Sequence, residues 1–236
     1  INVNSQIEKN NVIETPLNIS SKKKNLEIVD ILLKNPRIEI GVYALKGLEN
    51  ITEITIPSSS KIIGKSAFEG CTSLVHVVIP SSVTKIDDLA FLNCTSLVKV
   101  VDHSKITEYP TSCFENCKSL KEINIPTSVK HLGQNAFLHC ESLEEIEIPS
   151  SVETISCSTF CGCKSLKKLN LPPSVVQVLN DAFSQCDSLV DVVINSKSIS
   201  LIGNCFSSCK SLKNVTFDKS SKVVIGNAFI GCSSLE

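Results

Sequence analysis

The sequence predicts a repeat solenoid, a single elongated domain made of stacked coils. Phenylalanine recurs every 23 residues from Phe68 to Phe229, and each of these residues has a Cys three positions later and a Leu six positions later. The apolar positions between them keep the same spacing through eight periods without insertion or deletion. A fixed period of this length indicates a solenoid, because each unit buries its apolar face only against its neighbours.

Each unit opens with a short strand. In the unit that starts at Leu74, Val77 and Ile79 continue the apolar pattern in alternation, and Pro80 follows. Proline cannot donate to a strand ladder, so it ends the strand. Strands on neighbouring coils of one parallel sheet lie about 4.8 Å apart, so eight or nine coils predict a body on the order of 40 Å long.

The remainder of the unit predicts two further elements. Val83 to Ile86 has the pattern of a second short extended stretch. Ala90, Phe91 and Cys94 have the apolar spacing of a single helical or 3₁₀ turn. Each coil is therefore expected to be strand, turn, bridge and short helical turn.

A glycine precedes the Phe in several units. Gly64 and Gly133 lie four residues before it, whereas Gly203 and Gly226 lie three residues before it. We expect a glycine with positive φ to close this bend, because glycine adopts that conformation without steric cost.

The clear repeats are preceded by a less regular region. Residues 40–45 match residues 63–68, which predicts one earlier, degenerate repeat with Ile28, Ile31 and Leu33 in its strand positions.

The domain prediction has two parts. Residues 1–24 show no match to the repeat, and we expect a worn repeat, a cap or a tail there. Residues 25–236 are expected to form one solenoid of about eight to nine repeats, the last of them truncated. We expect the natural protein to be longer than this chain.

The unit Pro-x-x-Val-x-x-Ile…Ala-Phe-x-x-Cys-x-x-Leu-x-x-Ile-x-Ile resembles the BspA-like class of leucine-rich repeats, and residues 125–149 are nearly a consensus copy. Ser82 lies where an ordinary leucine-rich repeat has Asn or Cys, and this departure belongs to the pattern of the class. The resemblance implies a right-handed leucine-rich-repeat coil with a parallel β-sheet on the concave face. Short strands, turns and 3₁₀ or helical turns would form the other side. The resemblance also implies that the chain belongs to a surface-exposed protein, since this class occurs mostly in surface proteins of host-associated anaerobic bacteria and mucosal protozoa. Adhesion to host proteins is the function usually proposed for them.

The bulk composition disfavours several classes of function. A net charge of -1, with 23 basic and 24 acidic residues, provides no positive surface for nucleic acid or an anionic membrane. Eight of the 9 Phe residues occupy the repeat position, where they pack in the core. No apolar run approaches the roughly 18 to 20 residues of a membrane span. We therefore predict no nucleic-acid partner and no membrane insertion by this segment.

No catalytic motif stands out in the sequence. There is no phosphate-binding glycine loop, no H-E-x-x-H and no nucleophile elbow, and the four His residues are scattered. We predict that the protein is not an enzyme and binds no cofactor or metal.

The cysteines are expected to pack in the core. Eight of the 12 Cys form the ladder, and Cys113 and Cys205 replace an inward Ala of other repeats. Only Cys157 and Cys161 lie off these columns, and they lack the paired C-x₂-C spacing of zinc sites. Reduced, buried thiols are favoured over disulfides and over a metal site.

One repeat departs from the pattern at Asp102 and His103. Asp102 replaces an inward strand residue, His103 replaces Pro, and Tyr109 replaces the usual Ile. A buried Asp is costly unless paired. We therefore expect the strand to end near Val100 or Val101 and to turn Asp102 to the surface, either as a worn repeat or as a ligand notch.

The outward strand positions next to this irregularity predict a binding surface. Four Val residues on adjacent coils form an apolar patch, which is flanked by polar residues of the same two coils. Contiguous exposed apolar surface indicates a protein contact, although single exposed Val residues also satisfy β propensity. The predicted site comprises Val75, His76, Val78, Val98, Lys99, Val101, Asp102 and His103.

These observations favour a monomeric, non-enzymatic protein-binding scaffold that is part of a cell-surface or secreted adhesin-like protein. An intracellular, cytoplasmic interaction scaffold of the same fold is an alternative, which the Cys ladder favours. A structural spacer array is a second alternative.

Overall fold

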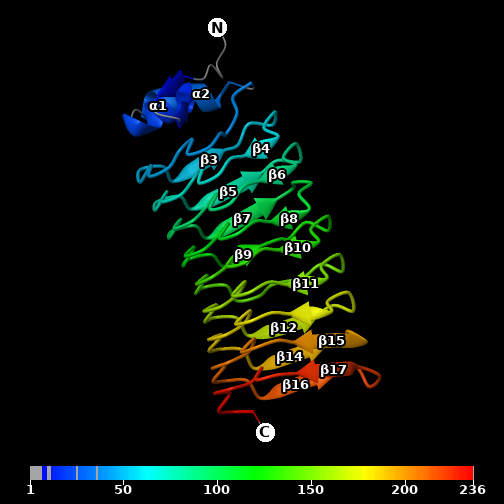
Figure 1. The fold of residues 1–236 in the computed structure, drawn as a ribbon. Helices are drawn as coiled ribbons and strands as arrows, with labels where there is room; N and C mark the ends of the chain where they lie inside the picture. Colours follow the sequence, from blue (N-terminus) through cyan, green and yellow to red (C-terminus); the bar gives the residue numbers. More distant parts are fainter. Residues whose placement is uncertain (1–6, 10–11, 25, 36, 236) are drawn as a thin grey trace.

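The computed structural model describes residues 7–9, 12–24, 26–35 and 37–235, and it shows a stack of coils that begins beside two short helices (Figure 1). The coils follow the repeat after a partial turn over residues 38–50. Coil 1 covers residues 51–73, coil 2 residues 74–96, coil 3 residues 97–119, coil 4 residues 120–142, coil 5 residues 143–165, coil 6 residues 166–188, coil 7 residues 189–211 and coil 8 residues 212–235. The predicted solenoid with parallel sheets is confirmed.

One side of the stack, the front face, carries the strands that open the coils. They are β3 (Glu53–Thr55), β5 (His76–Ile79), β7 (Lys99–Asp102), β9 (Glu122–Ile123), β12 (Lys168–Leu171), β14 (Asp191–Ile194) and β16 (Asn214–Phe217). Neighbouring strands are parallel and pair one repeat apart, so that Val77 lies opposite Val100. Alternation exposes His76 and Val78 and buries Val77 and Ile79, as the sequence pattern predicts.

The front face is not one continuous sheet. Strands β3, β5, β7 and β9 form a four-stranded sheet, and β12, β14 and β16 form a three-stranded sheet. Coil 5 lies between them and contributes no strand to the front face. Its segment 143–148 nevertheless keeps the alternation of buried and exposed residues.

The other side of the stack, the back face, carries a second set of parallel strands. They are β4 (Ile62–Ile63), β6 (Lys85–Ile86), β8 (Glu108–Tyr109), β10 (His131–Leu132), β11 (Thr154–Ile155), β13 (Gln177–Val178), β15 (Ser198–Leu201) and β17 (Lys222–Ile225). Strands β4 and β6 form a pair, and the other six form a single sheet. The second extended stretch predicted for Val83 to Ile86 is thus present as β6.

The segment around each Phe is a series of turns that also joins neighbouring coils. In coil 2 the amide of Phe91 donates to the carbonyl of Cys113 in coil 3 (2.9 Å), while the amide of Cys94 donates to the Phe91 carbonyl (3.2 Å). Leu89 and Asn93, two residues before and two after the Phe, have φ values of 63° and 59°. Left-handed residues at this spacing interrupt a helix, so the expected helical turn is resolved into separate hydrogen-bonded turns.

The expectation of a positive-φ glycine before the Phe holds only at Gly203, where φ is 59°. It is wrong at Gly64, Gly133 and Gly226, which do not have positive φ. A Cβ atom on Gly64 would lie 2.4 Å from the backbone carbon of Gly41 in the preceding turn. Close approach of neighbouring backbones, rather than φ, therefore requires glycine there.

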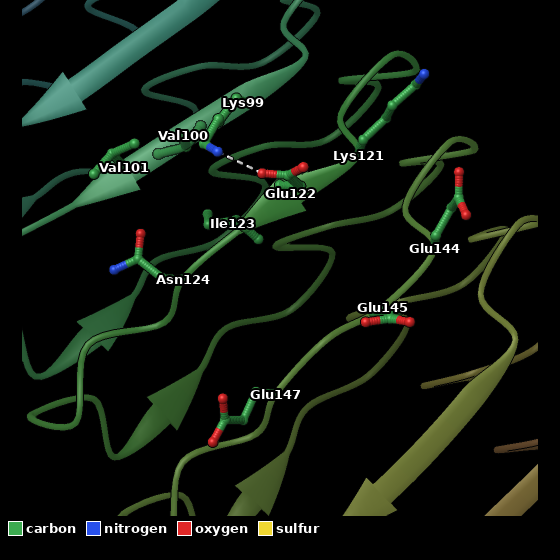
Figure 2. Close-up of a pocket in the computed structure, with 10 residues that line it drawn as sticks. All are labelled: Lys99, Val100, Val101, Lys121, Glu122, Ile123, Asn124, Glu144, Glu145 and Glu147. Carbon is green, nitrogen blue, oxygen red and sulfur yellow. Dashed lines mark hydrogen bonds and ion pairs between the residues drawn. The ribbon is translucent and has the colours of Figure 1, made fainter.

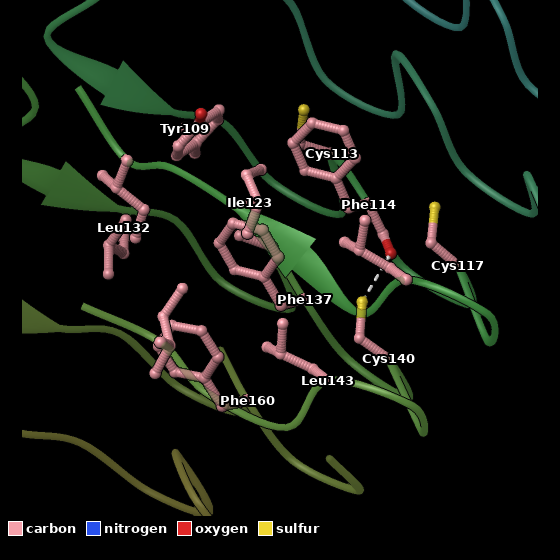
Figure 3. Packing of buried hydrophobic residues seen from close by; sticks show 14 of the residues in the cluster. Tyr109, Cys113, Phe114, Cys117, Ile123, Leu132, Phe137, Cys140, Leu143 and Phe160 are labelled. Carbon is pink, nitrogen blue, oxygen red and sulfur yellow. Dashed lines mark hydrogen bonds between the residues drawn. The ribbon is translucent and has the colours of Figure 1, made fainter. Parts of the chain in front are cut away.

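The core is a continuous column of side chains along the stack. The Phe rings from Phe68 to Phe229 stack with centroids 4.8–5.5 Å apart and interplanar angles of 2–12°. Beside them the ladder thiols from Cys94 to Cys232 donate to the Phe carbonyl of the preceding coil, as Cys140 does to Phe114 at 3.3 Å (Figure 3), and Cys71 donates to the carbonyl of Leu45. The inward position predicted for the ladder cysteines is confirmed for the seven from Cys71 to Cys209, which are buried, whereas Cys232 in the last coil is only partly buried. The thiol links coils as well as filling space.

The N-terminal region differs from the prediction. A hairpin of β1 (Ile7–Lys9) and β2 (Val12–Glu14) precedes α1 (Pro16–Lys22), which begins with Thr15 as N-cap, and α2 (Leu26–Leu33). The strand predicted through Ile28, Ile31 and Leu33 is therefore wrong, because these residues belong to a helix. The helix buries Val29, and Ile28 and Ile31 are exposed.

Candidate protein-binding surface

The predicted apolar patch lies on adjacent strands of the front face. Strands β5 and β7 pair in register, which places Val78 directly opposite Val101. The side chain of Val78 is 50 % exposed, and Val101 is partly exposed. Opposed residues on neighbouring strands lie close enough for their side chains to form one surface.

The other predicted residues surround this pair unequally. Val75 and Val98 lie at the entrances of β5 and β7 and are half-buried, with the Val98 amide donating to the Val75 carbonyl at 2.8 Å. His76 and His103 are exposed at the two ends of the patch. These residues form a small apolar strip with polar ends.

Lys99 joins the patch to the acidic middle of the front face. Its ammonium group lies 2.6 Å from a carboxylate oxygen of Glu122, one coil further on. The hydrogen bond and the charge of Lys99 lower the pKa of Glu122. The pair is exposed, so solvent screens it and it contributes little to stability.

The expected outward turn of Asp102 is wrong. Strand β7 continues through Asp102, whose side chain is 2 % exposed. Its carboxylate accepts a hydrogen bond from the Tyr109 hydroxyl at 2.5 Å and another from the Ser104 amide at 2.7 Å. The inward Asp is tolerated because the same repeat supplies its partners. Asp102 is therefore not part of an exposed surface.

The buried Asp102–Tyr109 pair is enclosed on all sides. The Tyr109 ring lies edge-on to Phe114 and to Phe137, each with ring centroids 5.6 Å apart (Figure 3). Burial raises the pKa of Asp102, although the hydrogen bonds from Tyr109 and Ser104 oppose this. Burial also raises the pKa of Tyr109. The pair therefore lies in the interior of coil 3 and not on its surface.

A groove lies beside the apolar patch, and its shape was not predicted. It has a volume of about 680 Å³ and begins at Lys99 and Val101 of β7 (Figure 2). The residues that line its remainder are Val100, Lys121, Glu122, Ile123, Asn124, Glu144, Glu145 and Glu147. The acidity of this region is visible in the sequence as consecutive outward Glu residues. The depth of the groove is not visible in the sequence, because it depends on the spacing between coils 4 and 5.

Asn124 lies at the edge of this groove, directly after the last residue of β9. Its side-chain carbonyl accepts from the Asp102 amide at 2.9 Å, and its side-chain amide donates to the Asp102 carbonyl at 2.7 Å. These two bonds take the place of backbone pairing, which explains why β9 ends at Ile123.

The cysteines offer no evident chemistry in the described residues. All 12 are free thiols there, and Cys157 and Cys232 are the two that are not buried. Burial raises the pKa of Cys94, Cys113 and Cys140 well above the usual range, so they hold little nucleophilic thiolate. No group of three His, Cys, Asp or Glu in the described part of the chain could hold a metal ion.

Within the described residues, no helix has the length and apolar character needed to cross a membrane.

The chain matches the family model described as the BspA type leucine rich repeat region, in six copies over residues 38–156 and 130–236. No curated protein matches it. It is similar to the solved structure of a leucine-rich repeat protein of T. pallidum, with 27 % identity and a TM-score of 0.57 over 84 % of this chain and 82 % of that one.

Two further structures show the same fold. A leucine-rich cell surface protein of Faecalibacterium prausnitzii A2-165 is 26 % identical, with a TM-score of 0.52 over 76 % of this chain and 57 % of that one. This chain thus matches little more than half the length of that protein. A leucine-rich repeat protein of Bacteroides ovatus is 24 % identical, with a TM-score of 0.51 over 84 % of this chain and 69 % of that one.

Proposed function

Because the chain belongs to the BspA-type leucine-rich repeat family, we propose that it is a non-enzymatic scaffold that binds a partner protein on its front face. Solenoids present extended surfaces whose outward residues vary while the core residues repeat. The front face fits this role, since its buried positions are uniform and its exposed positions differ from coil to coil.

The observation that carries this proposal is the pair formed by Val78 and Val101. Both residues lie in the middle of strands, on adjacent coils and on the same side of the sheet. Val75 and Val98 extend the apolar strip, and His76, Lys99 and His103 provide a polar border. An apolar centre with a polar rim is the composition of a protein-binding surface.

We place this scaffold in a surface or secreted adhesin-like protein that binds host or partner proteins. The F. prausnitzii relative is described as a cell surface protein, which supports this location. An intracellular scaffold of the same fold is a second candidate, favoured by the 12 free thiols. A spacer array is a third candidate, and it would need no front-face contact. In each case we propose a monomer with one solenoid, which begins after α2 at residue 38.

The binding surface is tested by Val78→Glu with Val101→Glu. Capture of candidate host proteins should fall at least tenfold, because two charges would enter the apolar strip. The matched control is Ile62→Glu with Val176→Glu, which places the same charges on exposed apolar positions of the back face. Equal capture by both variants would reject the patch. If no substitution on the front face reduced capture, the spacer would be favoured.

The location is tested by a free-thiol count on protein purified from its native source without reductant. Several disulfides would reject the intracellular scaffold. A full complement of free thiols would support it.

A further inference from the structure

We propose that the groove on the front face at coil 5 binds an extended segment of a partner protein in which alternate residues are Lys or Arg. This inference rests on the proposed function only in assuming that the front face contacts protein. It concerns the part of that face from Lys99 to Asn195, which shares only Lys99 and Val101 with the apolar patch, and it identifies the chemistry of the partner.

The first observation is that the sheet opens at coil 5. Along the rest of the front face each coil donates to the one before it, as Val98 does to Val75 at 2.8 Å and Lys121 does to Val98 at 2.9 Å. No corresponding bond to Lys121 is made from coil 5 within the described residues. The next hydrogen bond between coils joins the amide of Lys167 in coil 6 to the carbonyl of Glu144 in coil 5 at 3.2 Å. Within the described residues, coil 6 then donates no further backbone hydrogen bond to coil 5 until Val176, near the back face.

The opening leaves main-chain groups without partners. The backbone N–H groups of Glu145, Ile146 and Glu147 make no hydrogen bond to any residue of the described chain. Free main-chain donors can bind carbonyl oxygens of a ligand.

The opening also uncovers the edge of the core. Ile123 and Ile146 are each 8 % exposed, whereas Val77, Val100 and Val192 at the equivalent position of closed coils are 1 % exposed. Ile125 is also 8 % exposed, whereas Ile79 and Ile194 at its equivalent position are 0 % exposed. The increase in exposed fraction is small for each residue, but all three residues border the opening between coils 4 and 5. Water therefore reaches the floor of the groove.

The groove has the size of a peptide site. Its first part has a volume of about 680 Å³, and a second part of about 690 Å³ shares Ile123, Asn124 and Glu147 with the first. The second part continues past Thr127 and Pro149 to Asn170 and Pro172. Together the two parts cross coils 3 to 7 of the front face.

The charge of the groove selects a cationic occupant. Four Glu residues and two Lys residues line its first part (Figure 2). Glu122 is paired with Lys99 and Glu144 with Lys167, each at 2.6 Å. Glu145 and Glu147 make no ion pair with any described residue. These two carboxylates are free to bind a cation.

The spacing of these carboxylates selects an extended segment. Glu145 and Glu147 are two residues apart in a stretch that alternates buried and exposed side chains, so they point to the same side about 7 Å apart. Side chains at alternate positions of an extended partner have the same separation. Lys or Arg at positions i and i+2 of the partner would therefore meet both carboxylates as the segment lies across the front face.

The test is fluorescence anisotropy with a labelled ten-residue peptide in which Arg alternates with Thr. We expect saturable binding that weakens as salt is raised. Glu145→Gln with Glu147→Gln should weaken it at least tenfold. The matched control, Glu108→Gln with Glu153→Gln, removes two exposed carboxylates of the back face and should leave binding unchanged.

A second peptide separates the site from general attraction between opposite charges. It has the same composition with all Arg residues in one block followed by all Thr residues. The alternating peptide should bind several-fold more tightly, and it should slow hydrogen exchange of the amides of residues 145–147. Equal affinity for the two peptides, or equal loss in the front-face and back-face variants, would overturn the proposal.

The outcomes also separate this proposal from the function of the apolar patch. Peptide binding that survives Val78→Glu alone, a residue that does not line the groove, supports the groove even if this change leaves host-protein capture intact. Loss of capture in that variant, together with no peptide binding by the wild type, rejects the groove and leaves the patch in place.

Discussion

The hydroxyl of Ser21 donates a 2.7 Å hydrogen bond to the backbone carbonyl of Ala44. In coils 1 to 8 the equivalent carbonyl accepts from the amide of the preceding turn, as Ala90 does from Phe68 at 2.7 Å. The turn at Ala44 has no preceding coil, and α1 supplies the missing donor. Asn18 acts in the same way, donating from its side-chain amide to the carbonyl of Val42 at 2.8 Å.

We therefore propose that α1 caps the first turn, because Asn18 and Ser21 supply donors to two carbonyls that have no preceding coil. Ser21→Ala and Asn18→Ala should each destabilise the protein by about 1–3 kcal/mol, because each leaves a buried carbonyl without a donor. Urea denaturation measures the effect, with Ser81→Ala, an exposed front-edge residue, as the control. Values near zero for Ser21→Ala would contradict the cap.

The buried carboxyl of Asp102 predicts an unusual pH dependence of stability. Burial raises its pKa in the folded state above the ordinary value of 3.8. The folded protein therefore holds this proton more tightly than the unfolded chain, and stability is lost as pH rises from the ordinary value through the raised pKa.

The variant Asp102→Asn should remove this loss, because its amide keeps an oxygen that can accept from Tyr109 and has no charge to bury. Relative to wild type, the variant should become progressively more stable as pH rises above 3.8. Urea denaturation at a series of pH values measures the difference. A difference that is constant with pH would show that the Asp102 pKa is the same in both states.

The partner of Asp102 gives a second prediction. Tyr109→Phe should cost about 1–3 kcal/mol, since it leaves a buried carboxylate short of one donor. Replacing both residues with Ile, the residue of neighbouring repeats, should be nearly neutral or stabilising, as is found when buried polar pairs become apolar. A double variant as unstable as Tyr109→Phe would contradict this account of the pair.

Asp102 also shows what the sequence could and could not predict. The sequence shows that Asp102 and Tyr109 both depart from the repeat, but it does not show that their side chains are hydrogen-bonded to each other. The two changes occur in the same repeat and compensate each other across the coil. The period of 23 predicts the strands, the buried Phe residues and the inward cysteines, because these depend on contacts between one repeat and the next.

The open groove could not be predicted in the same way. Coil 5 is close to the consensus of the repeat, and Leu143, Ile146 and Ile148 are all in their expected places. Whether its strand pairs with coil 4 depends on the spacing of two backbones. Asn124, which bonds to Asp102 with its side chain, is a local signal that pairing ends there. The α2 helix was missed because Ile28, Ile31 and Leu33 also fit a strand pattern.

The cysteines should differ in reactivity by position in the coil. Cys157 is half-buried and lies off the ladder, whereas Cys140 is buried and burial raises its pKa. Since the thiolate is the reactive form, a thiol reagent should modify Cys157 first and Cys140 only after unfolding. Mass spectrometry of partly labelled native protein identifies the sites. Early modification of Cys140 would mean that the stack opens locally on the timescale of labelling.

Close packing of backbones between coils is tested by substituting glycine with alanine. At Gly133 a Cβ atom would lie 2.7 Å from the Tyr109 carbonyl oxygen and 2.8 Å from the Pro110 carbonyl carbon. Backbone atoms cannot move aside as a flexible side chain can, so Gly133→Ala should destabilise the protein by about 1–3 kcal/mol.

At Gly226, where φ is also not positive, the nearest atom to an added Cβ atom would be 3.7 Å away. Gly226→Ala is therefore the matched control and should change the free energy of unfolding by less than about 0.5 kcal/mol. Similar effects at both positions would show that loss of glycine flexibility, rather than contact between coils 3 and 4, determines the cost.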